Sequence, residues 1–468
     1  MWTFIDIVVL KGFSFVATII LARLLGPAEF GLIGMIYVFI AIGTTLVDSG
    51  LSSSLIRTID ANDDDFCTVF YTNVGLSVIV YLFFFFCAPF IALFYKQEIL
   101  TALIRLYCLS FIISSFSSIQ ISIFTKNMQF KKLMFFNLPG TIIGICVGVT
   151  MGYLRFGVWS IIWMYLVTQL VQSTLLWIAS PWKPSLKFSS NRLKYHFNFG
   201  YKLLLSGVID TVFQNIYNVV IGRNYSVKTL GYYERAYIFN QYPVTVLTGI
   251  IGKVTYPLIA NIQDQKERVA FIYKKILQVT FFATAPLMLG ASAIAKPLFI
   301  LALGKEWLPA VPFFQIICLG SIFYPIHSFN INILKVYDRT DLFLKLEVIK
   351  KIVISFGVGL GFIFGIYGLV WSSVITSFVA LVINTHYSQN IINYSTKNQL
   401  LDMLPIFILS VLMSLIMLMV LPLLTSFNNI IQVLLTSIIG ICAYLAASFL
   451  FKIPSFIYLT NLIKNRKL

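Results

Sequence analysis

Long apolar stretches follow one another along almost the whole chain, separated by short groups of charged residues, glycine, proline and asparagine. A helix that crosses a bilayer needs about 20 mostly apolar residues. By this criterion the pattern predicts fourteen spanning helices. They cover about 3–24, 31–56, 68–94, 101–124, 134–154, 157–179, 200–222, 236–260, 270–294, 309–335, 342–364, 367–390, 403–424 and 430–451.

Some stretches leave the pattern open. Polar residues and prolines dilute 200–222, 236–260 and 309–335. The region 295–308 is too short to cross a bilayer alone, so it predicts either a re-entrant turn or an extension of the span that follows. The first apolar run is long enough to span and has no small-residue cleavage site, which favours a membrane helix over a removable signal peptide.

Composition supports the same class. Hydrophobic residues make up 59% of the chain and charged residues 11%, whereas a soluble domain carries roughly 25% charge. The mean hydropathy is +0.89. The sequence therefore predicts an all-α polytopic membrane protein. The six cysteines form no C-x-x-C pair, so neither a zinc site nor a disulfide framework is indicated.

The chain is strongly basic, with a formal net charge of +17. In a soluble protein this balance would suggest a nucleic-acid partner. When the N-terminus is placed in the cytoplasm, however, most of the 34 lysines and arginines fall on inner-side loops. We therefore expect both termini to be cytoplasmic and expect no nucleic-acid partner.

A short motif occurs twice. Arg23 precedes Gly31 by eight residues, and Arg223 precedes Gly231 by the same spacing, 200 residues later. Six predicted spans separate the copies, so both copies would enter the membrane in the same direction. This pattern predicts two parallel six-helix lobes related by an axis along the membrane normal. The alternative is chance similarity between two apolar helices that are each followed by a turn.

The repeat and the loops give the expected domain boundaries. Residues 1–180 form the first lobe, 200–395 form the second, and 396–468 contain two peripheral spans and a cytoplasmic tail. Residues 181–199 mix basic and aromatic side chains, which suits a cytoplasmic interfacial linker on anionic lipid.

Three segments carry a family resemblance: IILARLLGPAEFGLIGM, VDSGLSSSLIR and GRNYSVKTLGYYERA. Together with the arrangement of spans, they make the chain resemble the Wzx/WzxC-like polysaccharide flippases of the multidrug/oligosaccharidyl-lipid/polysaccharide superfamily. That family has a short basic segment before its first span, whereas here the apolar run begins at residue 3. Either that segment is dispensable or the true start lies upstream of Met1.

The resemblance implies transport without a cofactor. It implies that undecaprenyl-pyrophosphate-linked oligosaccharide moves from the inner to the outer leaflet of the bacterial cytoplasmic membrane by alternating access. A glycan polymerase and the export machinery would be partners. It also implies that the first two helices of each lobe border a central cavity, in agreement with the polar faces along these spans.

Candidate site residues follow from these polar faces. We expect the substrate-binding residues to be Lys11, Arg57, Lys253, Gln214 and Asn218. We expect Asp210 and Asp48 to take part in ion coupling, since an intramembrane charge is costly and commonly functional. The residues of the repeated turn motif, with a structural role, are Arg23, Gly26, Gly31, Arg223 and Gly231.

Each candidate also has a simpler explanation. Lys11 could pair structurally with Asp210 or extend to the membrane surface. Asp48 could cap a helix break, and Arg57 and Lys253 could simply follow the positive-inside pattern.

Other features favour no further chemistry. The run Asp63–Asp65 is more typical of a solvated turn than of a metal site, and the three histidines are scattered. No GxxxxGK[ST] phosphate loop is present in the sequence.

Two other functions stay open on the sequence alone. One is a cation-coupled exporter of drugs or small molecules from the same superfamily. The other is a membrane-embedded polysaccharide polymerase or ligase. Such enzymes carry a large outer loop, whereas the longest expected outer loop here is about 222–235.

Overall fold

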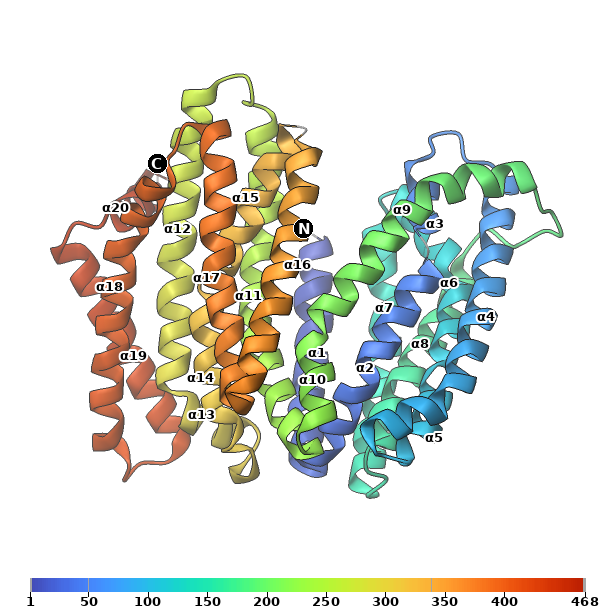
Figure 1. Cartoon of the computed structure of the whole chain (residues 1–468), viewed down its shortest axis with the longest axis horizontal. Helices are drawn as coiled ribbons and strands as arrows, with labels where there is room; N and C mark the ends of the chain where they lie inside the picture. The colour runs from blue at the N-terminus through green and yellow to red at the C-terminus, as the bar shows by residue number, and fades with distance from the viewer. Residues whose placement is uncertain (1, 49, 338, 466–468) are drawn as a thin grey trace. The chain divides into compact units, whose positions relative to one another are not determined.

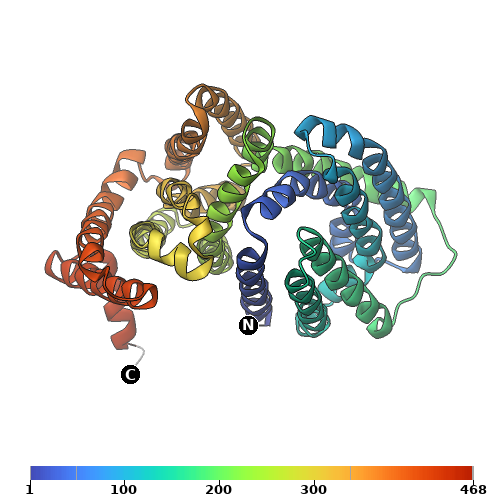
Figure 2. The same cartoon turned by 90° about the horizontal axis from the view of Figure 1, so that it is seen from below.

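The computed structural model describes residues 2–48, 50–337 and 339–465, and this part of the chain consists of helices and short turns without a strand. The chain divides into two compact units, Met1–Glu234 and Arg235–Leu468 (Figure 1). Figure 2 shows the same helices from below. The boundary between the units falls inside one long helix, α11 (Val227–Ala260).

The other helices of the first unit are α1 (Trp2–Leu25), α2 (Pro27–Asp48), α3 (Leu51–Arg57), α4 (Asp63–Tyr95), α5 (Ile99–Tyr107), α6 (Leu109–Lys126), α7 (Phe130–Tyr153), α8 (Trp159–Ala179), α9 (Ser190–Gln214) and α10 (Ile216–Asn224). The other helices of the second unit are α12 (Lys266–Ala293), α13 (Ala295–Ala302), η1 (Lys305–Trp307), α14 (Ala310–Ser321), α15 (Tyr324–Val336), α16 (Thr340–Ile363), α17 (Gly365–Ile392), α18 (Thr396–Val420), η2 (Leu421–Leu424), α19 (Asn429–Leu450) and α20 (Pro454–Asn465).

Within the described residues, 10 helices are long and apolar enough to cross a membrane. The number rises to 11 when α9 and α10, which meet at a 44° bend, count as one span. The predicted all-α membrane fold is confirmed, and the count of fourteen stays a prediction. One long helix outside this set, α16, carries Lys345, Glu347 and Lys350 in its first half, which lowers its apolar character.

Several predicted spans are interrupted. The predicted span 31–56 is divided into α2 and α3, and Gly50 between them has a φ of 68°, a left-handed value that glycine adopts without strain. The predicted span 101–124 corresponds to α5 and α6, which meet at Cys108. The region 295–308 forms the short α13 and η1. Apolar runs thus locate membrane segments but not the breaks inside them.

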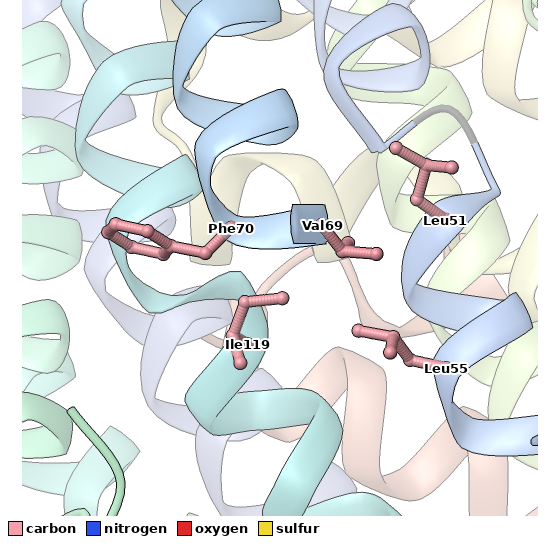
Figure 3. Packing of buried hydrophobic residues seen from close by; sticks show 5 residues of the cluster. All are labelled: Leu51, Leu55, Val69, Phe70 and Ile119. Carbon is pink, nitrogen blue, oxygen red and sulfur yellow. The ribbon is translucent and has the colours of Figure 1, made fainter. Parts of the chain in front are cut away.

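A hydrophobic cluster at one end of the first unit joins α3, α4 and α6 (Figure 3). Leu51 and Leu55 of α3, Val69 and Phe70 of α4, and Ile119 of α6 are all buried there. This packing holds the short α3 in place beyond the break at the end of α2. It therefore positions the polar residues near that break.

Glycines allow α7 and α8 to pack closely. A Cβ atom on Gly144 would lie 1.9 Å from Oγ1 of Thr168, and one on Gly148 would lie 2.6 Å from Cβ of Met164. Small residues at a spacing of four let membrane helices approach to backbone distance. The two helices therefore form a tight pair within the first unit.

In the second unit, a polar clamp joins α12 to α18 and to the connection that precedes it. Lys274 pairs with Asp402 at 2.8 Å, and the Tyr394 hydroxyl donates to the same carboxylate. Burial, and then the hydrogen bond to Asp402, raise the pKa of the Tyr394 phenol above its ordinary value. Tyr394 therefore stays protonated and remains a donor.

Candidate functional site

The first unit contains a polar pocket of about 300 Å³ beside the break between α2 and α3. Most of its lining side chains are hydroxyls and carboxamides, and Asp48 is the single charged group among the described residues that line it. The lining residues are Thr44, Val47, Asp48, Ser52, Ile56, Asn73, Ser114, Ser115, Ser117, Ser118, Ile121, Ser122, Asn137, Gln169, Gln172 and Leu176.

The hydroxyl-rich wall of the pocket is α6. Serine competes with helix geometry in water, but in a membrane helix its hydroxyl can donate to a carbonyl of the preceding turn. Ser114 donates to the carbonyl of Phe111 at 3.0 Å, and Ser118 donates to that of Ser115 at 2.9 Å. These bonds use the hydroxyl protons, so the two serine oxygens can act only as acceptors toward any further partner.

Carboxamides complete the walls from α4, α7 and α8. The Asn73 amide donates to Oγ of Ser118 at 3.1 Å, and the Gln172 amide donates to the backbone carbonyl of Asn137 at 3.2 Å. The carbonyl oxygens of Asn73 and Gln169 have no hydrogen-bond partner in the described part of the chain. An unpaired buried amide oxygen costs about 1–3 kcal/mol, so the pocket wall holds acceptors that a ligand could satisfy.

Asp48 is the last residue of α2, and its side chain is exposed. It lies in the pocket lining together with Thr44 of the same helix and Ser52 of α3. Its predicted roles in ion coupling or in helix capping are not tested by this position. The position does bring the carboxylate together with the serines of α6, an association that the sequence alone does not predict.

A second polar cluster joins α9 to α3 and α4. The ring of His196 lies 2.8 Å from Oγ of Ser54 through Nδ1 and 3.0 Å from Oδ1 of Asp65 through Nε2. Arg192 reaches the same carboxylate oxygen at 3.5 Å. The contacts are satisfied when His196 donates to Asp65 and accepts from the hydroxyl of Ser54.

This cluster corrects one interpretation of the sequence. The side chains of Asp65 and His196 are both 0% exposed, so Asp65 does not belong to a solvated turn. Asp65 also caps α4, since it exchanges hydrogen bonds with Asn62. The cluster has the residue types of a hydrolase triad, but serine and aspartate face the opposite ring nitrogens from those that a triad uses. The cluster instead connects α9 to α3 and α4 within the first unit.

The two copies of the repeated motif meet where α2 crosses the start of α11. A Cβ atom on Gly31 would lie 1.9 Å from the carbonyl oxygen of Val227, and one on Gly231 would lie 1.9 Å from the carbonyl oxygen of Pro27. The contact is reciprocal, because Pro27 and Val227 hold the same position in the two copies. Only glycine fits at either place.

The predicted residues of α9 and α10 have different environments. Asn218 is buried and donates to the carboxylate of Glu234, whereas Gln214 is exposed at the end of α9. Asp210 is half-buried on α9, next to Thr211, whose hydroxyl lies 3.2 Å from that of Thr45 on α2. Asn218 therefore already has a partner within the protein.

The predicted arginines and the turn glycine are placed as follows. The guanidinium of Arg57 lies 4.7 Å from the ring centre of Phe199, and that of Arg223 lies 5.1 Å from the ring of Phe94. Gly26 joins α1 to α2 with a φ of 77°. Arg23 is exposed in the last turn of α1.

Lys11 and Lys253 lie in α1 and α11, but their side chains are outside the described residues. Neither the substrate-binding role nor the simpler explanations for these lysines are tested. Among the residues that the structure describes, no group of three or more His, Cys, Asp or Glu side chains is placed to hold a metal ion.

The pocket was missed at the sequence level because its residues come from six helices. A signal was present in the run SSFSSIQIS at 114–122, which places serines on one face of a helix. The polar faces from which the candidate residues are predicted lie on the first two spans of each lobe, and this run lies outside them.

Comparison with known proteins identifies the family. The family model described as "Polysaccharide biosynthesis protein" matches residues 20–312. The chain belongs to this family. The lipopolysaccharide biosynthesis protein WzxC of Escherichia coli (strain K12) is 25% identical over 351 residues, which cover 75% of this chain and 71% of WzxC. The teichuronic acid biosynthesis protein TuaB of Bacillus subtilis (strain 168) is 25% identical over 305 residues, which cover 64% and 62% of the two chains.

Solved structures show the same fold. The lipid II flippase MurJ in an inward closed conformation has a TM-score of 0.74 at 17% identity, covering 95% of this chain and 98% of MurJ. An inward-facing multidrug transporter of the MATE family has a TM-score of 0.63 at 16% identity, covering 81% and 94%. The expected resemblance is confirmed. The chain is a multi-pass membrane protein of the bacterial cytoplasmic membrane.

Proposed function

We propose that this protein is a flippase that moves a polyprenyl-pyrophosphate-linked oligosaccharide from the inner to the outer leaflet. The observation that supports this function most strongly is the match of the polysaccharide-biosynthesis family model over 20–312. A fold shared with a lipid II flippase over 95% of the chain agrees with it. The printed names of the relatives concern lipopolysaccharide and teichuronic acid, which are both surface glycans.

The physical task explains why a transporter is needed. A glycan head group carries many hydroxyls and an anionic pyrophosphate, and each unsatisfied polar group costs several kcal/mol in hydrocarbon. The protein has to replace water around the head group while the lipid tail stays in the bilayer. Alternating access between the two lobes, with boundaries near 1–180 and 200–395, would meet this need without covalent chemistry.

Reconstitution tests the function directly. Purified protein is placed in liposomes that contain a labelled polyprenyl-pyrophosphate-linked oligosaccharide, and the glycan reaching the opposite leaflet is measured with an impermeant lectin. We expect leaflet exchange only in vesicles that contain the protein. Vesicles with an unrelated multi-pass protein are the control. Equal exchange in both vesicle types would contradict the proposal, and transport of a cationic drug instead would favour the drug-exporter alternative.

Basic side chains are proposed to receive the pyrophosphate. Lys11, with Arg57 and Lys253, would supply the charge, and Gln214 and Asn218 would add polar contacts. Asp210 and Asp48 would couple transport to an ion gradient. Both termini would be cytoplasmic, and a polymerase would receive the glycan on the outer side.

Lys11 offers the sharpest test of this assignment. Lys11→Ala should abolish glycan export in a complementation assay while membrane abundance stays normal, because the cation is lost. Lys11→Arg should keep part of the activity, since the charge remains but the head-group shape changes. Lys228→Ala removes an exposed lysine from α11 and serves as the control. If Lys11→Ala lowers abundance and Asp210→Ala in the same chain restores it, the lysine has a structural role instead.

A further inference from the structure

The hydrogen-bonding groups of the polar pocket are mostly acceptors. The hydroxyl protons of Ser114, Ser118 and Ser122 are already donated to backbone carbonyls of α6. The carbonyl oxygens of Asn73 and Gln169 accept no hydrogen bond from any residue that the structure describes. A ligand that matches this wall therefore has to bring several hydrogen-bond donors.

The charge of the pocket narrows the ligand class. Asp48 is the single ionisable side chain among the described lining residues, and it is acidic. An anionic pyrophosphate would meet a carboxylate and serine lone pairs, and none of the described lining residues is basic to compensate its charge. The pocket is therefore unsuited to the charged part of a glycan lipid and suited to a neutral part.

Neutral sugar units have the complementary chemistry. Their hydroxyls are donors, and two neighbouring hydroxyls can donate to the two oxygens of one carboxylate. The remaining lining groups include the apolar side chains of Ile56, Ile121 and Leu176, which can contact the C–H face of a sugar ring. A volume of about 300 Å³ is at the lower end for small-ligand pockets, which fits one sugar unit rather than a whole repeat.

We propose that this pocket, formed by α2, α3, α4, α6, α7 and α8, is a subsite for one neutral, hydroxyl-rich sugar unit of the transported glycan. This inference rests on the proposed function, because it assigns to the pocket a part of the same cargo. In this arrangement the pocket binds a sugar unit, whereas the basic residues bind the pyrophosphate.

Saturation-transfer NMR on the purified full-length chain in detergent tests the subsite. The probes are millimolar glucose, galactose, N-acetylglucosamine and rhamnose, each alone, and sodium diphosphate followed by its ³¹P linewidth. At least one sugar should receive saturation from the wild-type protein. The double variant Ser114→Ala/Ser118→Ala should bind it about tenfold more weakly, as expected from two lost hydrogen bonds. The double variant Ser110→Ala/Ser173→Ala changes two buried serines outside the lining, and should bind like the wild type.

If the double serine variant folds poorly, a second variant, Asp48→Asn, still tests the subsite. Asp48→Asn alters an exposed side chain and removes only the charge. It should weaken the same sugar about threefold or more, because hydrogen bonds to a charged acceptor are the stronger ones. If Asp48 serves ion coupling alone, the variant should lose transport but bind sugar as the wild type does, which would contradict its place in the subsite.

The other outcomes separate the two proposals. Absence of saturation transfer to every sugar, or equal transfer to wild type and both pocket variants, overturns the subsite even if reconstituted transport is normal. Two further results would overturn the subsite. One is broadening of the ³¹P signal of diphosphate by the wild type that is absent with the pocket variants. The other is a pocket that responds to sodium ions but to none of the sugars. Sugar binding that depends on the pocket in a protein without leaflet exchange supports the subsite and contradicts the flippase function instead.

Discussion

At Gly31 and Gly231, one added carbon atom would disrupt the packing of two helices. Each has a backbone carbonyl oxygen 1.9 Å from the position of a Cβ atom, far inside van der Waals contact. Because a carbonyl of a neighbouring helix cannot rotate away like a side chain, α2 and α11 would have to separate. Small residues serve the same purpose in other membrane helix pairs, where packing rather than the hydrophobic effect drives association.

We therefore predict that Gly31→Ala and Gly231→Ala each destabilise the protein. Overpacking in a tight contact costs about 1–3 kcal/mol, so the midpoint of thermal unfolding in detergent should fall and membrane abundance should drop. Gly75→Ala is the control, since a Cβ atom at Gly75 meets no heavy atom within 4 Å. It should leave stability unchanged or raise it slightly. Equal behaviour of all three variants would show that the helices separate at no cost.

At the scale of elements, α9 is held by interactions at its N-terminal end and by the connection that precedes it. Trp182 donates from its indole to Asp63 at 2.8 Å, and the backbone N–H of Ser189 donates to the hydroxyl of Thr68 at 3.0 Å. With the buried pair of Asp65 and His196, these contacts attach the connection to the start of α4. The expected interfacial linker at 181–199 is thus in contact with α4, and its second half is helical.

Removing the buried charge should release this connection. Asp65→Asn replaces the anion that His196 and Arg192 contact with a neutral amide, and weakening hydrogen bonds to a buried charged group costs about 1–3 kcal/mol. We expect trypsin to cut the variant after Lys187 about tenfold faster than the wild type, as followed by gel electrophoresis over time. Asp60→Asn, which changes an exposed aspartate before α4, should be cut at the wild-type rate. Equal cutting of both variants would mean that the cluster does not hold the connection.

The contrast between predicted and observed elements has a physical basis. Apolar runs predict membrane helices well, because a helix that satisfies its own backbone is the stable form of an apolar segment in lipid. Partners that lie far apart in sequence leave no such periodic signal. Asp65 and His196 are 131 residues apart, so the sequence predicts a solvated run of three aspartates, whereas the last of them is fully buried. The serines of α6 and Asp48 were likewise brought together only by the fold.

For the whole molecule, the predicted orientation can be tested with single cysteines. Leu186 lies in the connection before α9 and is 97% exposed, and Ser426 is exposed between α18 and α19. In a background without the six native cysteines, an impermeant maleimide should label Ser426→Cys in intact spheroplasts. Leu186→Cys should be labelled only after permeabilisation, because the positive-inside pattern places it in the cytoplasm. The reverse labelling would invert the topology, and labelling of both positions in intact cells would indicate leaky membranes.

The reciprocal contact between Gly31 and Gly231 also has a consequence for ancestry. A contact in which each partner presents the same surface to the other is the kind that a two-fold homodimer makes. A half-length ancestor with one copy of the motif would therefore have had the means to pair with a second copy of itself. Fusion of two such genes would preserve the crossing without inventing a new surface. From then on the two glycines would diverge as one unit, so that relatives that replace either residue should carry a matching change at its twin.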